Sequence, residues 1–242
     1  ISGWTGSGSA PGADDNASGV SGVVELAHYF SEKTNREKLR KPIQFAIWSG
    51  EEIGILGSSH FVKNYKDQWK RDFAQAFEAG LNMDMIGRLD PVTRQLHVQG
   101  LGSSKRWSQV VEQVAAQSPL HLVVTQDPYL PTDAMAVYMG KVPSISFFTG
   151  VHLDYHTPND TAEKINHAGL VETIKTVRAT VLALNIAPQK IVNYDHVEGS
   201  ATGSGGNRSF RIFLGTIPDY SQEGVKGVRI SGTSKNSPAE LA

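Results

Sequence analysis

The stretch AGLNMDMIG, residues 79–87, is almost entirely apolar and has the length of a strand that is buried on both faces of a sheet. One charged residue, Asp84, interrupts it. An unpaired carboxylate inside an apolar run is costly, so a functional reason for this residue is favoured. We therefore predict a buried strand here that carries Asp84 to a site.

The segments around this stretch alternate between strand-like and helix-like patterns. Further strands are predicted at IQFAIW (43–48), RQLHVQG (94–100), LHLVV (120–124) and VPSISFF (142–148). Helices are predicted over residues 17–34, 57–70, 105–117, 134–140 and 166–184. Because nearly apolar strands alternate with helices, the predicted fold class is α/β, with a mainly parallel mixed sheet sandwiched between helices.

Composition excludes several classes of protein. The 242 residues are enough for one substantial domain and part of a second. The 23 basic and 24 acidic residues nearly cancel and form no long basic run, which argues against nucleic acid as a partner. The absence of cysteine rules out disulfides, a thiolate nucleophile and cysteine-ligated zinc. No apolar stretch reaches the roughly 20 residues that a membrane-spanning helix needs.

Ionisable side chains follow the predicted strands. The pair Glu51-Glu52 follows residues 43–48, and His156 follows the strand at 142–148. In open α/β sheets, the loops beyond the carboxyl ends of the strands bring distant residues together. Neighbouring carboxylates there would repel each other strongly unless cations or protons compensated them. A divalent metal centre is the simplest explanation, with Asp15, which precedes the first helix, as another ligand candidate.

Each of these residues also has a purely structural explanation. The pair Asp14-Asp15 could cap the first helix, and Glu51-Glu52 could be a solvated pair at the start of the next helix. A lone histidine such as His156 is usually an ordinary polar residue. The metal hypothesis depends on all of them converging in the fold.

Four segments resemble a known family, the co-catalytic di-zinc aminopeptidases, which are zinc exopeptidases related to bacterial leucyl aminopeptidase, glutamate carboxypeptidase, glutaminyl cyclase and the transferrin receptor. These segments occur in the family's order and at comparable spacing: PGADDNASG (11–19), SGEEIGILGS (49–58), NMDMIGR (82–88) and FFTGVHLDYHTPNDT (147–161). The resemblance covers roughly residues 1–187. It implies a hydrolase that cleaves the N-terminal peptide bond of peptides with a free N-terminus.

The resemblance also implies a role for each residue. Asp15 would bridge two zinc ions, Glu52 and His156 would complete the site of one, and Asp84 would bind the other. The two ions would lower the pKa of a shared water, and Glu51 would be the general base.

Supporting roles follow from the same resemblance. Tyr129 matches a tyrosine that donates a hydrogen bond to the tetrahedral intermediate in some members, and a cis peptide bond is expected after Asp15. Asp133 and Asp160 are candidates for orienting the ligands, although both could equally be turn carboxylates. Ala134 stands where many relatives have histidine, which affects the expected specificity rather than the metal site.

A further departure concerns the second zinc ion. Family members supply another histidine from a His-x-Asp segment before the bridging aspartate, and no histidine precedes His28 here. We expect that the catalytic domain, residues 1–187, lacks its N-terminal part, so that this chain holds one metal well and the other poorly.

The C-terminal part has a different composition. Residues 188–207 include VEGSATGSGGN and are interpreted as a flexible linker. Residues 208–242 resemble the first half of a PDZ domain, which would bind peptide C-termini, with an irregular β tail as the alternative.

Two other functions stay open. One is a single-zinc glutaminyl cyclase that uses Asp15, Glu52 and His156, and the other is a non-catalytic binding protein of the transferrin receptor kind. Family habit suggests a periplasmic or secreted protein. The hydrophobic candidates for the walls of a substrate pocket are Met135, Tyr138, Met139 and Phe147-Phe148.

Overall fold

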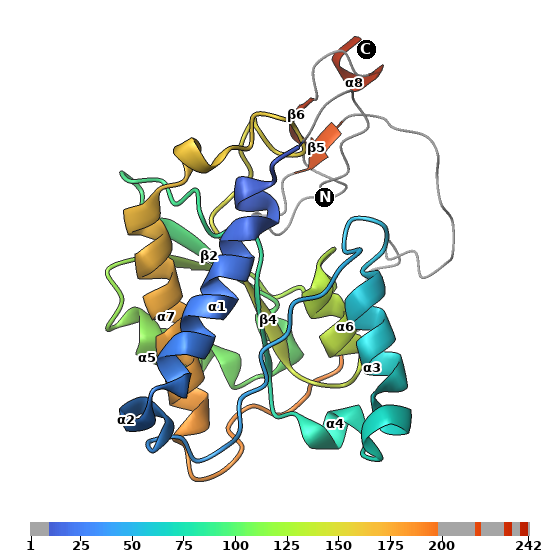
Figure 1. The fold of residues 1–242 in the computed structure, drawn as a ribbon, viewed down its shortest axis with the longest axis vertical. Helices are drawn as coiled ribbons and strands as arrows, with labels where there is room; N and C mark the ends of the chain where they lie inside the picture. The colour runs from blue at the N-terminus through green and yellow to red at the C-terminus, as the bar shows by residue number, and fades with distance from the viewer. Residues whose placement is uncertain (1–9, 198–215, 219–229, 234–237, 242) are drawn as a thin grey trace.

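The computed structural model describes residues 10–197, 216–218, 230–233 and 238–241, and its centre is a mixed sheet (Figure 1). The four strands are β1 (Gly80–Met83), β2 (Gln95–Gln99), β3 (His121–Val124) and β4 (Ser144–Phe148). Their order is β1-β4-β2-β3, with β1–β4 and β2–β3 parallel and β2–β4 antiparallel. The predicted mainly parallel mixed sheet is confirmed.

Helices cover both faces of this sheet. Helices α1 (Gly19–Ser31), α5 (Trp107–Ala115) and α7 (His167–Asn185) lie on one side of it, and α3 (Leu56–Trp69) and α6 (Asp133–Met139) lie on the other (Figure 1). Shorter elements are α2 (Lys33–Arg36), α4 (Phe73–Ala76), the π-helical turn η1 (Ala13–Ser18) and the 3₁₀ turns η2 (Leu101–Ser103) and η3 (Ala162–Lys164). The long helices therefore agree with their predicted ranges to within a few residues.

The apolar core is divided by the sheet. In the larger cluster, side chains of α1, α5 and α7 pack against the strands. The strand residues include Leu96 and Val98, both with 0% exposure. Helix α5 contributes Trp107, Val110 and Val111 to it, and Val114 extends the same buried stripe at helical spacing. The smaller cluster includes Tyr65 of α3 and Val137 of α6 on the other side. Each helix is thus held by an apolar face rather than by its intrinsic propensity.

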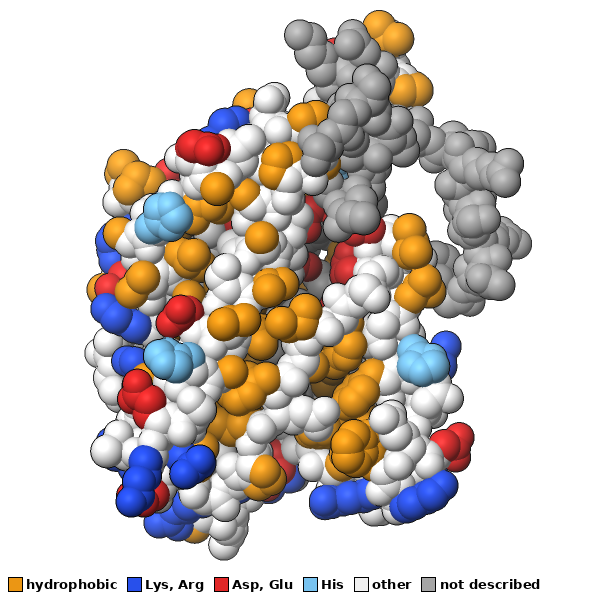
Figure 2. All heavy atoms as spheres, in the orientation of Figure 1, with side chains coloured by type: hydrophobic (Ala, Val, Ile, Leu, Met, Phe, Trp, Pro, Cys, Tyr) orange, Lys and Arg blue, Asp and Glu red, His pale blue; other side chains and the backbone are white. Residues whose placement is uncertain are grey.

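The predicted strand at residues 43–48 is wrong for the part of the chain that the structure describes. This segment has no regular secondary structure and runs between α1 and α3 (Figure 1). Phe45 and Ile47 are 37% and 56% exposed. Figure 2 shows apolar side chains gathered on the face between α1 and α3. Its composition suits a strand, but β-structure also requires a neighbouring strand, and the four-stranded sheet has none beside it.

Strand β1 is shorter than predicted because its backbone turns at Met85. The Asp84 N–H still donates to the Phe147 carbonyl at 3.2 Å, which continues the pairing with β4. Met85 then has φ 52°, a left-handed conformation that no strand can continue through. Asp84 therefore lies at the end of the strand instead of inside it.

The domain boundaries at residues 187 and 207 stay predictions, but the flexibility predicted for the linker does not extend to residues 191–197. Val192 is 1% exposed, and the Asp195 carboxylate accepts the Lys105 N–H at 2.7 Å. Farther on, β5 (Thr216–Pro218) pairs antiparallel with β6 (Ile230–Thr233), and α8 is Pro238–Leu241. Residues 208–215 lie outside the described residues, so the PDZ-like resemblance stays a prediction. Among the described helices, none has both the length and the apolarity to cross a membrane.

Truncation of a core side chain should measure how much the sheet contributes to stability. Leu96→Ala removes a fully buried side chain from β2 and should lower the free energy of unfolding by about 2–5 kcal/mol. The control Val92→Ala alters a side chain that is 87% exposed and should change it by less than about 0.5 kcal/mol. Urea denaturation followed by circular dichroism measures both, and equal effects would contradict this description of the core.

Candidate metal centre

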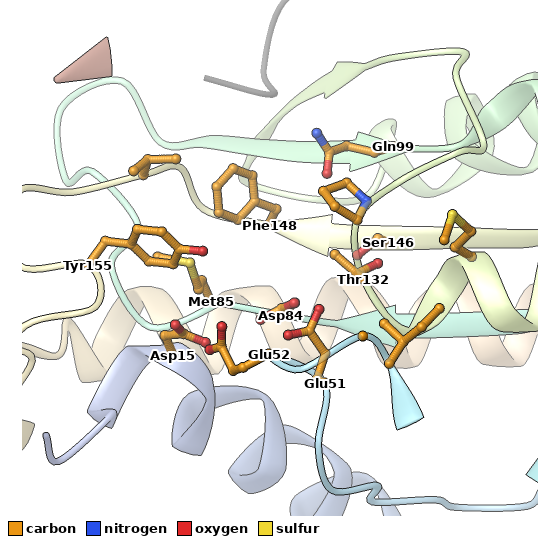
Figure 3. Close-up of a pocket in the computed structure, with 15 residues that line it drawn as sticks. Asp15, Glu51, Glu52, Asp84, Met85, Gln99, Thr132, Ser146, Phe148 and Tyr155 are labelled. Carbon is orange, nitrogen blue, oxygen red and sulfur yellow. The ribbon is translucent and has the colours of Figure 1, made fainter. Parts of the chain in front are cut away.

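Four loops and turns bring the predicted metal ligands and Glu51 together. Asp15 lies in η1, Glu51 and Glu52 lie in the turn before α3, Asp84 follows β1, and His156 lies in the loop after β4. Figure 3 shows the four carboxylates gathered at one end of a pocket. Because β1 and β4 are parallel neighbours, the loops that follow them start side by side.

Asp15, Glu52 and His156 form the tightest group. The His156 Nε2 atom lies 3.0 Å from Asp15 Oδ2 and 3.1 Å from Glu52 Oε2. One potential ligand atom from each residue lies within 4.8 Å of the others. Asp15 Oδ2 and His156 Nε2 are buried, yet neither has a partner in hydrogen-bond geometry. Buried polar atoms that converge without bonding to one another fit ligands that share a cation.

The electrostatics of His156 support this fit. Burial acts to lower the pKa of its imidazole, but contact with the carboxylates of Asp15 and Glu52 outweighs burial and raises the pKa from 6.5 to about 9. The two carboxylates thus favour a positive charge at this point, which suits a cation-binding site. His156 also has φ 56°, a left-handed conformation that is uncommon for a residue with a side chain and must be held by its surroundings.

Glu51 and Asp84 lie beside this group in a strongly acidic environment. Burial, followed by the charges of Asp84 and Glu52, raises the pKa of Glu51 from 4.5 to about 8. Burial, followed by the charge of Asp15, raises the pKa of Asp84 from 3.8 to about 8. Both groups therefore bind protons at a pH where an exposed carboxylate is ionised, because burial and neighbouring negative charges disfavour their ionised forms.

The turn that carries Asp15 is fixed by a buried carboxylate, Asp160. This side chain is 2% exposed and accepts the N–H of Asp14 at 2.9 Å and that of Asp15 at 3.0 Å. The structure therefore favours the orienting role over the turn role that the sequence left open. The peptide bond between Asp15 and Asn16 is cis, as the resemblance implied.

The turn that carries Asp84 is fixed by Asn16. The Asn16 side chain donates to the Met83 carbonyl at 3.0 Å and accepts the Met85 N–H at 3.2 Å. Since these two groups flank Asp84, Asn16 holds the carboxylate-bearing turn from both sides.

The remaining predicted site residues are not among those that line the pocket. The Tyr129 hydroxyl donates to the Val197 carbonyl at 2.9 Å, and Tyr129 does not line the pocket in the described part of the chain. Asp133 lies at the start of α6, where burial raises its pKa and the Ser58 side chain acts to lower it. Ala134 is 2% exposed inside α6. The catalytic role of Tyr129 stays a prediction.

The pocket beside the carboxylates has a volume of about 350 Å³. Of the predicted wall residues, Met135 and Phe148 do line it, whereas Tyr138 and Phe147 are core residues and Met139 is 63% exposed. The sequence did not single out several other residues that line it: Ile55, Gln99, Thr132, Ser146, Val151 and Tyr155. Gln99 and Ser146 could have been found from the sequence, because each is a polar residue within a buried strand.

Comparison with known proteins gives consistent matches. A family model described as peptidase family M28 matches residues 4–181. The curated aminopeptidase YwaD of Bacillus subtilis is 27% identical over 179 residues, which are 71% of this chain and 37% of YwaD.

Solved structures share the fold. BSAP, a zinc aminopeptidase from Bacillus subtilis, is 26% identical with a TM-score of 0.62, over 78% of this chain and 46% of that chain. The LapA aminopeptidase of Legionella pneumophila is 22% identical with a TM-score of 0.65, over 76% of this chain and 50% of that chain, and this likeness concerns the fold alone. The chain spans less than half the length of YwaD and BSAP.

The raised pKa values predict how stability depends on pH when no metal is bound. The pKa values of Glu51 and Asp84, about 8, and that of His156, about 9, exceed the ordinary values of 4.5, 3.8 and 6.5. The folded chain therefore binds more protons than the unfolded chain, and its stability should fall as the pH rises from about 4 to about 9. The pKa values of Asp90 and Asp154 are lowered instead, which makes stability rise with pH. This opposite effect is confined to pH values below about 4.

Thermal unfolding followed by circular dichroism in the presence of a chelator measures this dependence. The melting temperature should decline over this range, and Glu51→Gln should flatten the decline because it removes one of the three groups. A melting temperature that is constant or rises towards pH 9 would contradict the assignment.

Proposed function

The chain belongs to peptidase family M28, and from this premise we propose that the protein is a zinc-dependent aminopeptidase, which hydrolyses the N-terminal peptide bond of peptides. The observation that carries the proposal is the convergence of Asp15, Glu52 and His156, with the buried Asp15 Oδ2 and His156 Nε2 atoms lacking hydrogen-bond partners. Imidazole nitrogen and carboxylate oxygen are the zinc ligands available to a chain without cysteine.

The donor set fits two unequal zinc sites. Asp15, Glu52 and His156 would hold one ion, and Asp15 and Asp84 would contribute to the second. Zinc ions held there would polarise the scissile carbonyl, lower the pKa of the attacking water and offset the repulsion among the carboxylates.

Glu51 is proposed as the general base. Its side chain lines the pocket next to the ligand group and points into it (Figure 3). Burial and the neighbouring carboxylates raise its pKa from 4.5 to about 8, within reach of neutral pH, which suits a group that accepts a proton in one step and releases it in the next. Glu51 would take the proton of the attacking water and deliver it to the leaving amine.

The shape of the pocket supports an exopeptidase. The acidic end suits the positively charged α-amino group of a peptide, because oppositely charged groups attract strongly in a partly buried site. The adjoining walls include the apolar side chains of Ile55, Met135 and Phe148, which suit an apolar N-terminal residue.

Glu51→Gln should separate the base from the metal ligands. We expect it to retain zinc and to lose about 10²–10⁴-fold in kcat, the typical contribution of a general base. The measurement is hydrolysis of a peptide with a free N-terminus, with its N-acetylated form as the non-substrate. The control Glu37→Gln, at an exposed position, should have native activity.

Full activity in Glu51→Gln would exclude this residue as the base. Formation of N-terminal pyroglutamate without peptide hydrolysis would instead show that the protein is a cyclase.

His156→Ala should test the metal site without measuring catalysis. It removes the one nitrogen ligand of the three-residue group. Loss of a residue that only hydrogen-bonds to a ligand typically weakens metal binding by about 10–100-fold, so loss of the ligand itself should weaken zinc binding by more than about 100-fold. Zinc competition with a chromogenic chelator measures this, with His167→Ala, at an exposed position, as the control. Equal affinity in the two variants would contradict the ligand assignment.

A further inference from the structure

Asp14 belongs to one of three segments that each carry a candidate ligand, and it contacts the other two. Its side chain is 0% exposed, and it does not line the pocket. The segments are η1, which carries Asp15, the turn after β1, which carries Asp84, and the loop after β4, which carries His156. A fully buried carboxylate requires several partners, so the identity of those partners shows what it holds in place.

One oxygen of Asp14 joins the first two segments. Oδ1 accepts the Gly87 N–H at 2.6 Å and lies 2.9 Å from the Ser18 hydroxyl. The same hydroxyl accepts the Ile86 N–H at 3.0 Å. A β-carbon at position 87 would lie 2.9 Å from Oδ1 and 2.8 Å from Ile165, so only glycine allows this close approach.

The other oxygen of Asp14 joins the third segment. His152 Nε2 lies 3.1 Å from Oδ2, and the His152 side chain is 15% exposed. A carboxylate oxygen accepts hydrogen bonds, so the contact places an imidazole Nε2–H as the donor. His152 precedes His156 by four residues in the same loop, and His156 has the left-handed φ of 56° that its surroundings must maintain.

The main chain of Asp14 is held as well. Its N–H donates to both oxygens of Asp160, at 2.9 and 3.1 Å. Asp160 itself lies only four residues beyond His156 in the sequence. The loop after β4 therefore contacts Asp14 at two points. The Asp160 side chain accepts the main-chain N–H of Asp14, and His152 contacts the Asp14 side chain.

We propose that Asp14 and His152 form a positioning pair for the metal centre, in which the His152–Asp14 hydrogen bond sets the place of the His156 loop relative to Asp15 and Asp84. Neither residue lines the pocket, so the pair acts through the ligands and not on the substrate. This inference depends on the zinc site of the proposed function. The pair gives a role to Asp14, the first aspartate of PGADDNASG, and to His152, the first histidine of GVHLDYHT.

The test compares His152→Leu, which removes the donor, with His152→Gln, which retains a donor near the position of Nε2. Zinc is titrated into the full chain against a chromogenic chelator, and the visible spectrum of the cobalt(II)-loaded chain reports the ligand geometry. His152→Leu should weaken zinc binding by about 10–100-fold and change the cobalt spectrum, and His152→Gln should recover most of both. The control His121→Leu lies at an exposed position of β3 and should match the native chain.

A merely structural role would lower the melting temperature of His152→Leu while leaving zinc affinity and the cobalt spectrum native, and that result would overturn the inference. Failure of His152→Gln to recover affinity would overturn it too, since the hydrogen bond is what positions the loop. If His152→Leu does not fold, Asp14→Asn takes its place with the same expected result, because it keeps the side-chain size but replaces an acceptor oxygen with an amide donor. An unsubstituted chain that binds no zinc would contradict the proposed function as well, whereas native binding with unaffected variants contradicts this inference alone.

Discussion

Repulsion among carboxylates that are withdrawn from water is the interaction on which the rest of this structure depends. Asp15, Glu51, Glu52 and Asp84 share one end of a pocket. The basic side chain of His156 contacts Asp15 and Glu52. Burial and this repulsion together raise the pKa values of Glu51 and Asp84 to about 8. Such a cluster persists only if the surrounding backbone prevents the loops from separating.

That restraint includes several buried hydrogen bonds between side chains and main chain. Asp160 accepts two N–H groups of η1, Asn16 holds both neighbours of Asp84, and Asp14 accepts the Gly87 N–H. Each of these bonds joins residues that are far apart in the sequence. The parallel pairing of β1 with β4 makes them possible, because it starts two ligand-bearing loops at one edge of the sheet.

Much of this site could be predicted from the sequence because its signals are local. The apolar strands, the helix periodicity and the motifs around Asp15, Asp84 and His156 each lie within about ten residues. What could not be predicted depends on partners elsewhere in the chain. Residues 43–48 have the composition of a strand, but strand formation requires a neighbour. Likewise, Asp14 and Asp15 are identical in chemistry, and only the fold shows that one faces His156 while the other faces His152.

The two sides of the sheet explain why the pocket was harder to predict than the ligands. Successive side chains of a strand point to opposite faces, so Ile145 and Phe147 of β4 enter the larger core cluster while Ser146 and Phe148 line the pocket. The Asn82 side chain of β1 bonds to Ser146 on that same pocket face, at 3.1 Å. One wall of the pocket is therefore built by sheet register, whereas the ligands are carried by loops. A change to a wall residue can alter which side chain the pocket accepts without moving the loops, because β4 is held from its other face by the core.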